Sequence, residues 1–235
     1  MRACIGKLYS RAVTARILHT VVIATTNRGK LEELRALLEG LPIEVRTLAE
    51  VGAGPDKLTI VEDGATFEEN AIKKARAVAE ATMALTIADD SGLEVDVLGG
   101  APGVRSARFA HERATDAENN AALIARLEEI AGESGETIFP ARFRCAMALV
   151  DPYSGFEPHL SEGRCEGKVT RAPRGTGGFG YDPLFLVDGA SKTMAELESE
   201  EKNRISHRAL ACLRMRPLIE RLLLDRDEKI RKILG

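Results

Sequence analysis

The sequence predicts an α/β protein, because short apolar runs rich in β-branched residues alternate with segments of helical periodicity. The run 21–25 (VVIAT) precedes the leucines of residues 31–41, which recur at helical spacing. Further along, the Ala-rich segment 66–81 precedes a second apolar run at 84–88. A chain of 235 residues buries a substantial core without the help of disulfides or structural metals.

The composition narrows the classes of function. Hydrophobic residues make up 44% of the chain and charged residues 29%, with a formal net charge of -3 at pH 7. This balance is typical of a globular domain and argues against a nucleic-acid partner, which would require a strongly basic surface. No apolar run approaches the roughly 18 residues of a membrane helix, so we expect no membrane partner.

The cysteines and the N-terminus bear on location. The four cysteines are scattered, without CxxC spacing or a Cys/His cluster: Cys4, Cys145, Cys165 and Cys212. This pattern predicts reduced thiols and a cytoplasmic protein. Residues 1–20 contain four Lys or Arg and no acidic residue, a bias typical of transit peptides and equally of a start codon placed too far upstream. We expect residues 1–20 to be an extension outside the fold and residues 21–235 to form a single domain.

Two helix starts are predicted in the first half of the chain. Asn27 is a good N-cap for the leucine-patterned helix. Thr66 and Glu69, three residues apart, have the spacing of a capping box. This second helix should end near Ala81.

A strand is predicted over residues 84–88, and the sequence DDSG (89–92) should lie at its C-terminal end. Alternating apolar residues at 93–97 then lead into a loop at 99–103. The polar group at 89–92 would therefore stand at an edge of the sheet.

The second half begins with a capping box at Thr115–Glu118 and a helix that should end near Gly132. Pro217 should break or kink the last helical stretch. The elements expected between these points are a strand at 143–150, a turn at 151–155, one or two strands up to Val169, a loop at 172–183, a strand at 184–187 and a helical stretch from Glu196 to about Leu224.

The segment Thr25-Thr26-Asn27-Arg28-Gly29-Lys30 stands where a strand passes into a helix. Free backbone N–H groups and the positive end of the helix would point at one place beside the Lys30 ammonium, an arrangement that suits a phosphate. The segment lacks the Walker A spacing, and Leu31 stands where that motif has Ser or Thr. An ordinary capped surface turn has the same features, so the segment alone leaves both interpretations open.

Carboxylates provide a candidate metal site. Asp89 and Asp90 should point to opposite faces of a strand, so one of them can reach a cleft, and Glu62 in the loop before the second helix is a second candidate ligand. Mg²⁺ is commonly held by one or two carboxylates together with substrate phosphates. The alternative is that Asp89 caps a turn and Glu62 is merely solvated.

Two further segments are candidates for ligand contact. The loop GTGGFGYDP (175–183) sets Phe179 and Tyr181 among four glycines, where an exposed ring would stack on a base and a buried one would only pack inward. Near the C-terminus, Lys202 and the sequence Ser206-His207-Arg208 group cationic and donor side chains that suit phosphates. An ordinary charged helix face would look the same.

Taken together and in order, these segments resemble the inosine triphosphate pyrophosphatase family: TTNRGK (25–30), VEDGATFEENA (61–71), ADDSGLEVDVLGGAPGVRSAR (88–108), GTGGFGYDP (175–183) and EEKNRISHR (200–208). The resemblance runs from about Val21 to Leu224. It implies an elongated mixed β-sheet flanked by helices, two lobes with a central substrate cleft, and a homodimer. The implied activity is Mg²⁺-dependent hydrolysis of ITP, dITP and XTP to the monophosphate and pyrophosphate, which cleanses the nucleotide pool.

The resemblance also implies roles for particular residues. Asp90 corresponds to the general base and Mg²⁺ ligand, and Glu62 lies in the acidic segment that supplies a further metal ligand. The residues implied to bind the nucleoside triphosphate are Thr25, Thr26, Asn27, Arg28, Gly29, Lys30, Ser91, Phe179, Gly180, Tyr181, Asp182, Lys202, His207 and Arg208. The sequence departs from the family pattern at Thr26, where Gly is frequent, and at Val61, where a second glutamate often precedes Glu62.

Two other functions compete with this one. A nucleotide-sensing module would grip phosphates with the same residues but would not require a carboxylate at Asp90. A Maf-type pyrophosphatase with another base specificity shares the general architecture, but the FGYDP loop and the SHR segment argue against it. If the protein is a pyrophosphatase of the family named above, a rigid hydrogen-bond donor in the pocket would bind the 6-oxo group of a purine and so exclude ATP, which has an amino group there.

Overall fold

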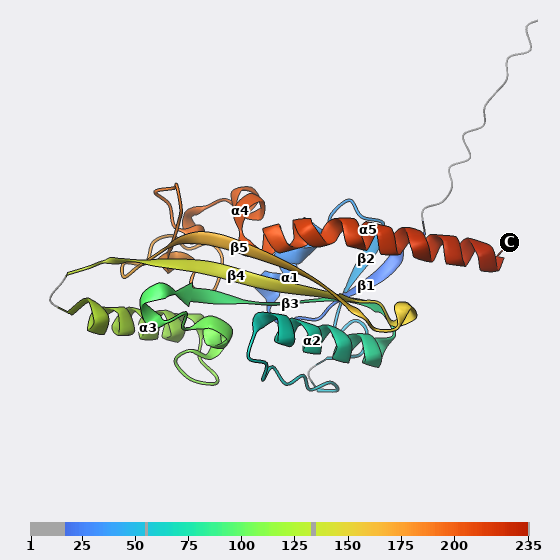
Figure 1. The fold of residues 1–235 in the computed structure, drawn as a ribbon, viewed down its shortest axis with the longest axis horizontal. Helices are drawn as coiled ribbons and strands as arrows, with labels where there is room; N and C mark the ends of the chain where they lie inside the picture. Colours follow the sequence, from blue (N-terminus) through green and yellow to red (C-terminus); the bar gives the residue numbers. More distant parts are fainter. Residues whose placement is uncertain (1–16, 55, 133–134, 235) are drawn as a thin grey trace, which may run out of the picture.

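A computed structural model of the chain describes residues 17–54, 56–132 and 135–234. Its centre is a six-stranded sheet in the order β2-β1-β3-β4-β5-β6 (Figure 1). β1 is parallel to both its neighbours, whereas the pairs from β3 to β6 are antiparallel, so the predicted mixed sheet is confirmed. The strands are β1 (His19–Ile23), β2 (Ile43–Thr47), β3 (Leu85–Val95), β4 (Ile138–Val150), β5 (Pro158–Thr170) and β6 (Phe185–Val187).

Three long central strands make the molecule elongated, as Figure 1 shows. β3 has 11 residues, and β4 and β5 have 13 each. β1 pairs only with residues 85–87 at one end of β3, and β6 pairs only with residues 167–169 at the opposite end of the sheet. Separate hydrophobic cores form at the two ends. The chain therefore has two lobes that share β3, β4 and β5.

Helices cover both faces of the lobe that contains β1. α1 (Arg28–Leu37) and α5 (His207–Leu234) pack on one face, and α2 (Phe67–Thr82) packs on the other. α3 (Asp116–Ala131) packs on the second lobe, and the short α4 (Ser199–Ile205) directly precedes α5. In Figure 1, α2 and α3 lie along one side of the elongated sheet and α5 lies along the other.

The predicted caps of α2 and α3 form, with one difference. The Thr66 hydroxyl accepts a hydrogen bond from the Glu69 N–H at 3.2 Å, but the Glu69 carboxylate reaches back to the N–H of Ala65 rather than to that of Thr66. Thr115 and Glu118 make the complete reciprocal box. Both helices therefore begin where their sequences predict, because the first-turn N–H groups find side-chain acceptors.

The strands differ from the prediction in two places. β3 continues without interruption through residues 89–92, so Asp90 lies in the middle of a strand and not at its end. The reason is β4, which pairs with β3 from Thr86 to Val95 and extends the ladder past the polar residues. β2 has no counterpart in the prediction, because its five residues are all partly buried and its short run gives little periodic signal.

The ends of the fold also differ from the prediction. β1 begins at His19, so residues 19 and 20 belong to the sheet and not to an extension; residues 1–16, with Cys4, lie outside the described residues. The predicted break at Pro217 is absent, since α5 is continuous through this position. Pro217 is exposed, so the carbonyl that loses its helical partner is accessible to water. The chain instead changes direction at Ser206, which has extended dihedrals between α4 and α5.

The cysteines within the described residues are free thiols. Cys145, Cys165 and Cys212 are buried free thiols, as the cysteine spacing predicts. Burial raises the pKa of the thiols of Cys165 and Cys212 to about 11 each, so both are protonated at neutral pH. Across the described parts of the chain, none of the helices is both long and apolar enough to cross a membrane.

Candidate active site

A cleft of about 640 Å³ opens between the two lobes. Both lobes contribute to its wall, and most of the predicted site residues line it. Those residues are Thr25, Thr26, Asn27, Lys30, Glu62, Asp90, Ser91, Phe179, Gly180, Tyr181, Asp182, Lys202, His207 and Arg208. Arg28 and Gly29 are the predicted residues that do not line the cleft.

The turn before α1 forms one wall of the cleft. The Asn27 side chain accepts the N–H of Lys30 at 3.0 Å and so caps the helix, whose first turn contains no acidic residue. No acidic side chain in the first turn therefore neutralises the positive end of the helix. The Arg28 side chain is 87% exposed and pairs with Glu32 at 2.9 Å, so it points away from the cleft.

Gly29 makes room for an aromatic ring. A Cβ atom at this position would lie 2.5 Å from Cδ1 of Phe179, a distance that real Cβ contacts do not show. The absence of a side chain therefore lets two segments touch across the cleft: the candidate phosphate-binding turn at residues 25–30, called the phosphate-type turn below, and the Gly-rich loop 175–183. Gly29 acts in this structure as a packing position between the two predicted binding segments.

Asp89 lies on the buried side of β3 and joins two cationic side chains. Its Oδ2 accepts from Nε and Nη2 of Arg208 at 3.1 and 3.0 Å and lies 3.2 Å from the Lys30 ammonium. Burial alone would raise the pKa of this carboxyl, but Lys30 and Arg208 hold it well below its usual value. Asp89 is therefore ionised and fixes the positions of both cations. The Ser91 hydroxyl, which accepts from Arg208 at 2.9 Å, belongs to the same network.

Asp90 points to the cleft, as the alternation of side chains along a strand predicts. Its Oδ2 accepts from the amide of Asn70 at 3.0 Å, and its Oδ1 lies 3.4 Å from the ammonium of Lys74. The same ammonium lies 2.7 Å from a carboxylate oxygen of Glu62. Burial alone would lower the pKa of Lys74, but the carboxylates of Asp90 and Glu62 raise it above its usual value. Lys74 is therefore a charged bridge between the two predicted metal ligands.

The donor set at this point suits a divalent cation. Glu62 and Asp90 both direct a carboxylate oxygen at one ammonium group, so their negative charge converges at a single place in the cleft. Mg²⁺ sites that include substrate phosphates usually have only one or two protein carboxylates. No group of three or more His, Cys, Asp or Glu side chains with metal-binding geometry occurs within residues 17–54, 56–132 and 135–234. A metal here would thus depend on oxygens from a bound ligand.

The other wall of the cleft is the loop 175–183. The Phe179 N–H donates to a carboxylate oxygen of Asp182 at 3.0 Å, and the buried Tyr181 hydroxyl donates to the carbonyl of Ser106 at 2.9 Å. The Lys202 ammonium and the Arg208 guanidinium lie 4.8 and 5.6 Å from the centre of the Phe179 ring. The ring of Phe179 is therefore held at the cleft with cations beside it.

Buried ion pairs fix the cations of this wall. Lys202 lies 2.6 Å from Asp182 and 2.7 Å from Glu33, and Glu33 also pairs with Arg208. Burial alone would lower the pKa of Lys202, but the two carboxylates raise it above its usual value. Glu33 on α1 thus connects α4 and α5 to the phosphate-type turn. Both cations keep their charge although their side chains are buried, because the carboxylates beside them raise their pKa values.

His207 stands out as an uncharged group among these ions. Its ring stacks on Phe143 with centroids 4.8 Å apart, and its Nδ1 is buried without a hydrogen-bond partner. Burial and the neighbouring cations Arg208 and Lys202 hold the pKa of His207 well below its ordinary value. The ring is therefore neutral at neutral pH, with one N–H donor and one acceptor nitrogen.

Several residues of the site have no counterpart in the sequence prediction. Asn70 and Lys74 stand four residues apart on α2 and so share one helix face. Two polar residues on an otherwise Ala-rich face are a feature of the sequence from which their role could have been predicted. Glu33 gives no signal, because it looks like any acid on an amphipathic helix. The Arg108 guanidinium donates to the carbonyl of Glu62 at 3.0 Å and links the lobes across the cleft. A contact between residues 46 positions apart cannot be read from local pattern.

Cations, a helix N-terminus and two convergent carboxylates in one interlobe cleft define a protein that binds a phosphorylated small molecule. The Ham1 family model matches residues 21–218, and the chain belongs to this family. This finding agrees with the family resemblance seen in the sequence.

Relatives and solved structures support the assignment. The dITP/XTP pyrophosphatase of Bacillus licheniformis is 48% identical over 200 residues, covering 85% of this chain and 97% of that protein. The dITP/XTP pyrophosphatase of Bacillus subtilis is 48% identical over 204 residues, covering 87% and 98%. A HAM1 protein from Coxiella burnetii superimposes with a TM-score of 0.74 at 39% identity, covering 86% of this chain and 98% of that structure.

Proposed function

We propose that this protein is a hydrolase of non-standard purine nucleoside triphosphates. It converts ITP, dITP and XTP to the monophosphate and pyrophosphate with Mg²⁺ as cofactor, and it acts in the cytoplasm as a homodimer. The observation that supports this most directly is the convergence of Asp90, the N-terminus of α1 and Phe179 on one cleft. Phosphates, a nucleophilic water and a purine each find a suitable partner there.

The triphosphate is expected to lie along the wall formed by α1. Backbone N–H groups of residues 25–30 and the ammonium of Lys30 provide donors, and Lys202 and Arg208 add positive charge from the opposite side. These cations are held by Asp89, Glu33 and Asp182, so they are oriented before substrate arrives. Preorganised charge of this kind stabilises the transition state without a reorganisation cost.

Asp90 is the proposed general base. It accepts the proton of a water whose oxygen forms a bond to the α-phosphorus, while the bond from that phosphorus to the bridging oxygen breaks and pyrophosphate leaves with the electron pair. The amide of Asn70 and the ammonium of Lys74 orient the Asp90 carboxylate for this role. The Lys74 ammonium, which lies beside Asp90 at the cleft, would also offset negative charge that develops at the phosphates.

Glu62 and Asp90 are the residues that would hold Mg²⁺, together with phosphate oxygens. When bound, the metal would supply charge neutralisation at the phosphates and Lewis-acid polarisation. The Arg108 guanidinium, through its bond to the Glu62 carbonyl, keeps Glu62 at the edge of the cleft.

The purine is expected to stack on Phe179. A 6-oxo purine presents a hydrogen-bond acceptor where adenine presents an amino donor, so a fixed donor such as the neutral His207 favours the former and rejects ATP. Four N–H contacts of Arg208 already go to Asp89, Glu33 and Ser91, which makes His207 or a backbone N–H the better donor.

The test is pyrophosphate release from ITP, XTP, dITP, GTP and ATP at equal concentration, with and without Mg²⁺. We expect metal-dependent release from ITP, XTP and dITP and little from GTP and ATP. Tight binding of ITP without release of pyrophosphate would contradict the proposal and favour a nucleotide sensor.

A further inference from the structure

The backbone of Gly180 is held on both sides of its Cα by α3. The Gly180 N–H donates to a carboxylate oxygen of Asp116 at 2.7 Å, and the Gly180 carbonyl accepts from the amide of Asn120 at 3.0 Å. Asp116 and Asn120 stand four residues apart, so they lie on one face of the helix. Together they form a clamp on the two peptide groups that flank the Gly180 Cα, in a loop that is otherwise rich in glycine.

The clamp stands on a rigid support. Thr115 and Glu118 fix the first turn of α3, and the Asn119 side chain bonds the backbone of Ala107 and Ala110. These bonds tie α3 to the segment 103–108, whose Ser106 carbonyl receives the Tyr181 hydroxyl. The loop 179–182 is therefore fastened on the side away from the phosphate-type turn.

The neighbours of Gly180 are the groups that face the ligand. Phe179 precedes it and lies against Gly29, while Tyr181 and Asp182 follow it. Gly180 itself has a φ of +61°, in the left-handed region that favours glycine, and a residue without a Cβ restricts its own backbone less than any other, so outside contacts must fix it. Displacement of this peptide by even a small distance would shift the Phe179 ring relative to the donors around His207.

We propose that Asp116 and Asn120 are positioning residues for base selection: they hold Gly180 so that Phe179 presents the purine to the discriminating donor. The inference rests on the proposed function. Discrimination between bases by hydrogen-bond direction requires a rigid frame, because a mobile loop lets the wrong base find a compromise position. The clamp supplies this rigidity from an element outside the phosphate-binding wall.

The experiment compares wild type with Asp116→Ala, Asp116→Asn and Glu118→Ala in turnover of ITP and ATP, which differ in the 6-oxo acceptor. Asp116→Ala should raise KM for ITP and lower the ITP-to-ATP ratio of kcat/KM by roughly 10-fold, the effect of one lost hydrogen bond to a charged acceptor, with kcat for ITP changed by less than about threefold. Asp116→Asn keeps an acceptor oxygen, so it should restore most of the selectivity.

Glu118→Ala is the matched control. Glu118 stabilises the start of α3 through Thr115 but does not contact Gly180, so its loss should lower Tm and leave the ITP-to-ATP ratio unchanged. A Glu118→Ala variant that loses as much selectivity as Asp116→Ala would overturn the inference, because helix stability would then be the cause. An Asp116→Asn variant as damaged as Asp116→Ala would also overturn it, since charge and not the hydrogen bond would matter.

Hydrogen exchange gives a readout that does not depend on catalysis. The Gly180 amide should exchange faster in Asp116→Ala than in wild type and in Glu118→Ala, and unchanged exchange in Asp116→Ala would contradict the clamp. If wild type releases no pyrophosphate from any nucleotide, the proposed function fails, and calorimetric binding of ITP and ATP to the same variants then decides the inference. Equal selectivity of binding in wild type and Asp116→Ala would refute it.

Discussion

The two walls of the cleft are built in different ways. On the phosphate side, Lys30 and Lys74 each pair with a buried or half-buried carboxylate, and the central acids Asp89 and Asp90 lie on β3, which pairs with β4 along this stretch. On the base side, the Gly-rich loop 175–183 is held by hydrogen bonds at its backbone groups and by the Lys202–Asp182 ion pair. One wall is an ion network on regular elements, and the other is a loop held largely through its backbone groups.

This difference predicts different kinds of damage. Removal of one member of an ion network leaves a buried charge without its partner, which affects folding and catalysis together. Removal of a backbone anchor releases a loop and leaves the core intact. Substitutions on the phosphate side should therefore lower kcat or stability, and those on the base side should change KM and selectivity.

The largest effect is expected for Asp90→Asn. The amide cannot accept a proton, so kcat for ITP should fall by roughly 10²–10⁴-fold. Its shape and its bond from Asn70 remain available, so Tm should change by only a few degrees. Steady-state kinetics and thermal unfolding measure the two effects. Near-wild-type turnover in this variant would remove Asp90 from the mechanism and with it the contrast between the walls.

Asp89→Ala should act mainly on stability. The change leaves Arg208 and Lys30 without their buried acceptor, which typically costs about 3–5 kcal/mol. Denaturant unfolding measures this loss.

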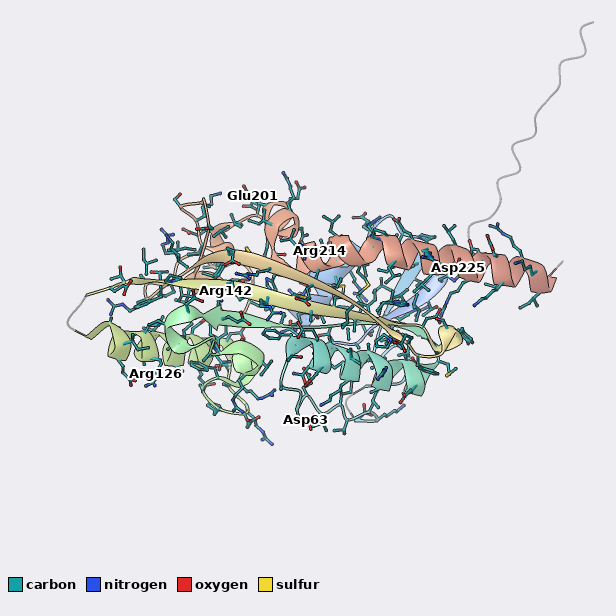
Figure 2. The ribbon with its side chains drawn as sticks, viewed as in Figure 1. Asp63, Arg126, Arg142, Glu201, Arg214 and Asp225 are labelled. Carbon is teal, nitrogen blue, oxygen red and sulfur yellow. The ribbon has the colours of Figure 1, made fainter. Side chains whose placement is uncertain are left out.

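The control for Asp89→Ala is Glu129→Ala, which breaks an exposed pair with Arg126 on α3, labelled in Figure 2, and should cost at most about 1 kcal/mol. Equal losses in the two variants would show that the buried network contributes no more than a surface pair. The distinction between the walls would then have no energetic basis.

Phe179→Ala tests the base side. Loss of a stacking partner typically costs about 1–3 kcal/mol of binding, so KM for ITP should rise roughly 5- to 150-fold. Because Phe179 also packs on Gly29, a Phe179→Leu variant keeps part of the packing without the aromatic face. A fall in kcat with unchanged KM would contradict the assignment of Phe179 to ground-state base binding.

The fold could be predicted wherever local chemistry determines it. The caps at Thr66 and Thr115 placed two helices correctly, because hydroxyl acceptors satisfy N–H groups within the same turn. The predicted strand at 84–88 is shorter than β3, because the polar residues 89–92 resemble a loop in the sequence. Only pairing with β4 keeps them extended. Pro217 was expected to interrupt α5, but solvent exposure at that position makes its lost hydrogen bond inexpensive.

The site could be predicted as a set of segments but not as a network. Motif order indicates that residues 25–30, Asp90 and the loop 175–183 belong together, and the structure places them on one cleft. The residues that hold them, such as Glu33 and Asp116, act across long sequence separations through a single contact. No periodicity in the local sequence indicates such a contact. From the sequence alone, each of these residues looks like an ordinary acid on a helix surface.

The smallest effect is a pH dependence of stability from His207, which lies where the two walls meet. Its pKa in the folded protein is well below the ordinary value, because of burial and the cations Arg208 and Lys202. Below about pH 6.5 the unfolded chain binds a proton that the folded chain does not, so the free energy of unfolding falls as pH falls, by up to about 1.4 kcal/mol per pH unit.

This contribution is present above the unfolded pKa and lost on acidification, so His207→Gln should reduce the loss of stability between pH 7 and pH 5. Urea unfolding of wild type and variant at the two pH values measures the difference. A constant gap between wild type and His207→Gln at both values would mean that His207 takes up a proton equally in the folded and unfolded states. Below about pH 6.5, a protonated imidazole would then replace the uncharged donor invoked for base selection.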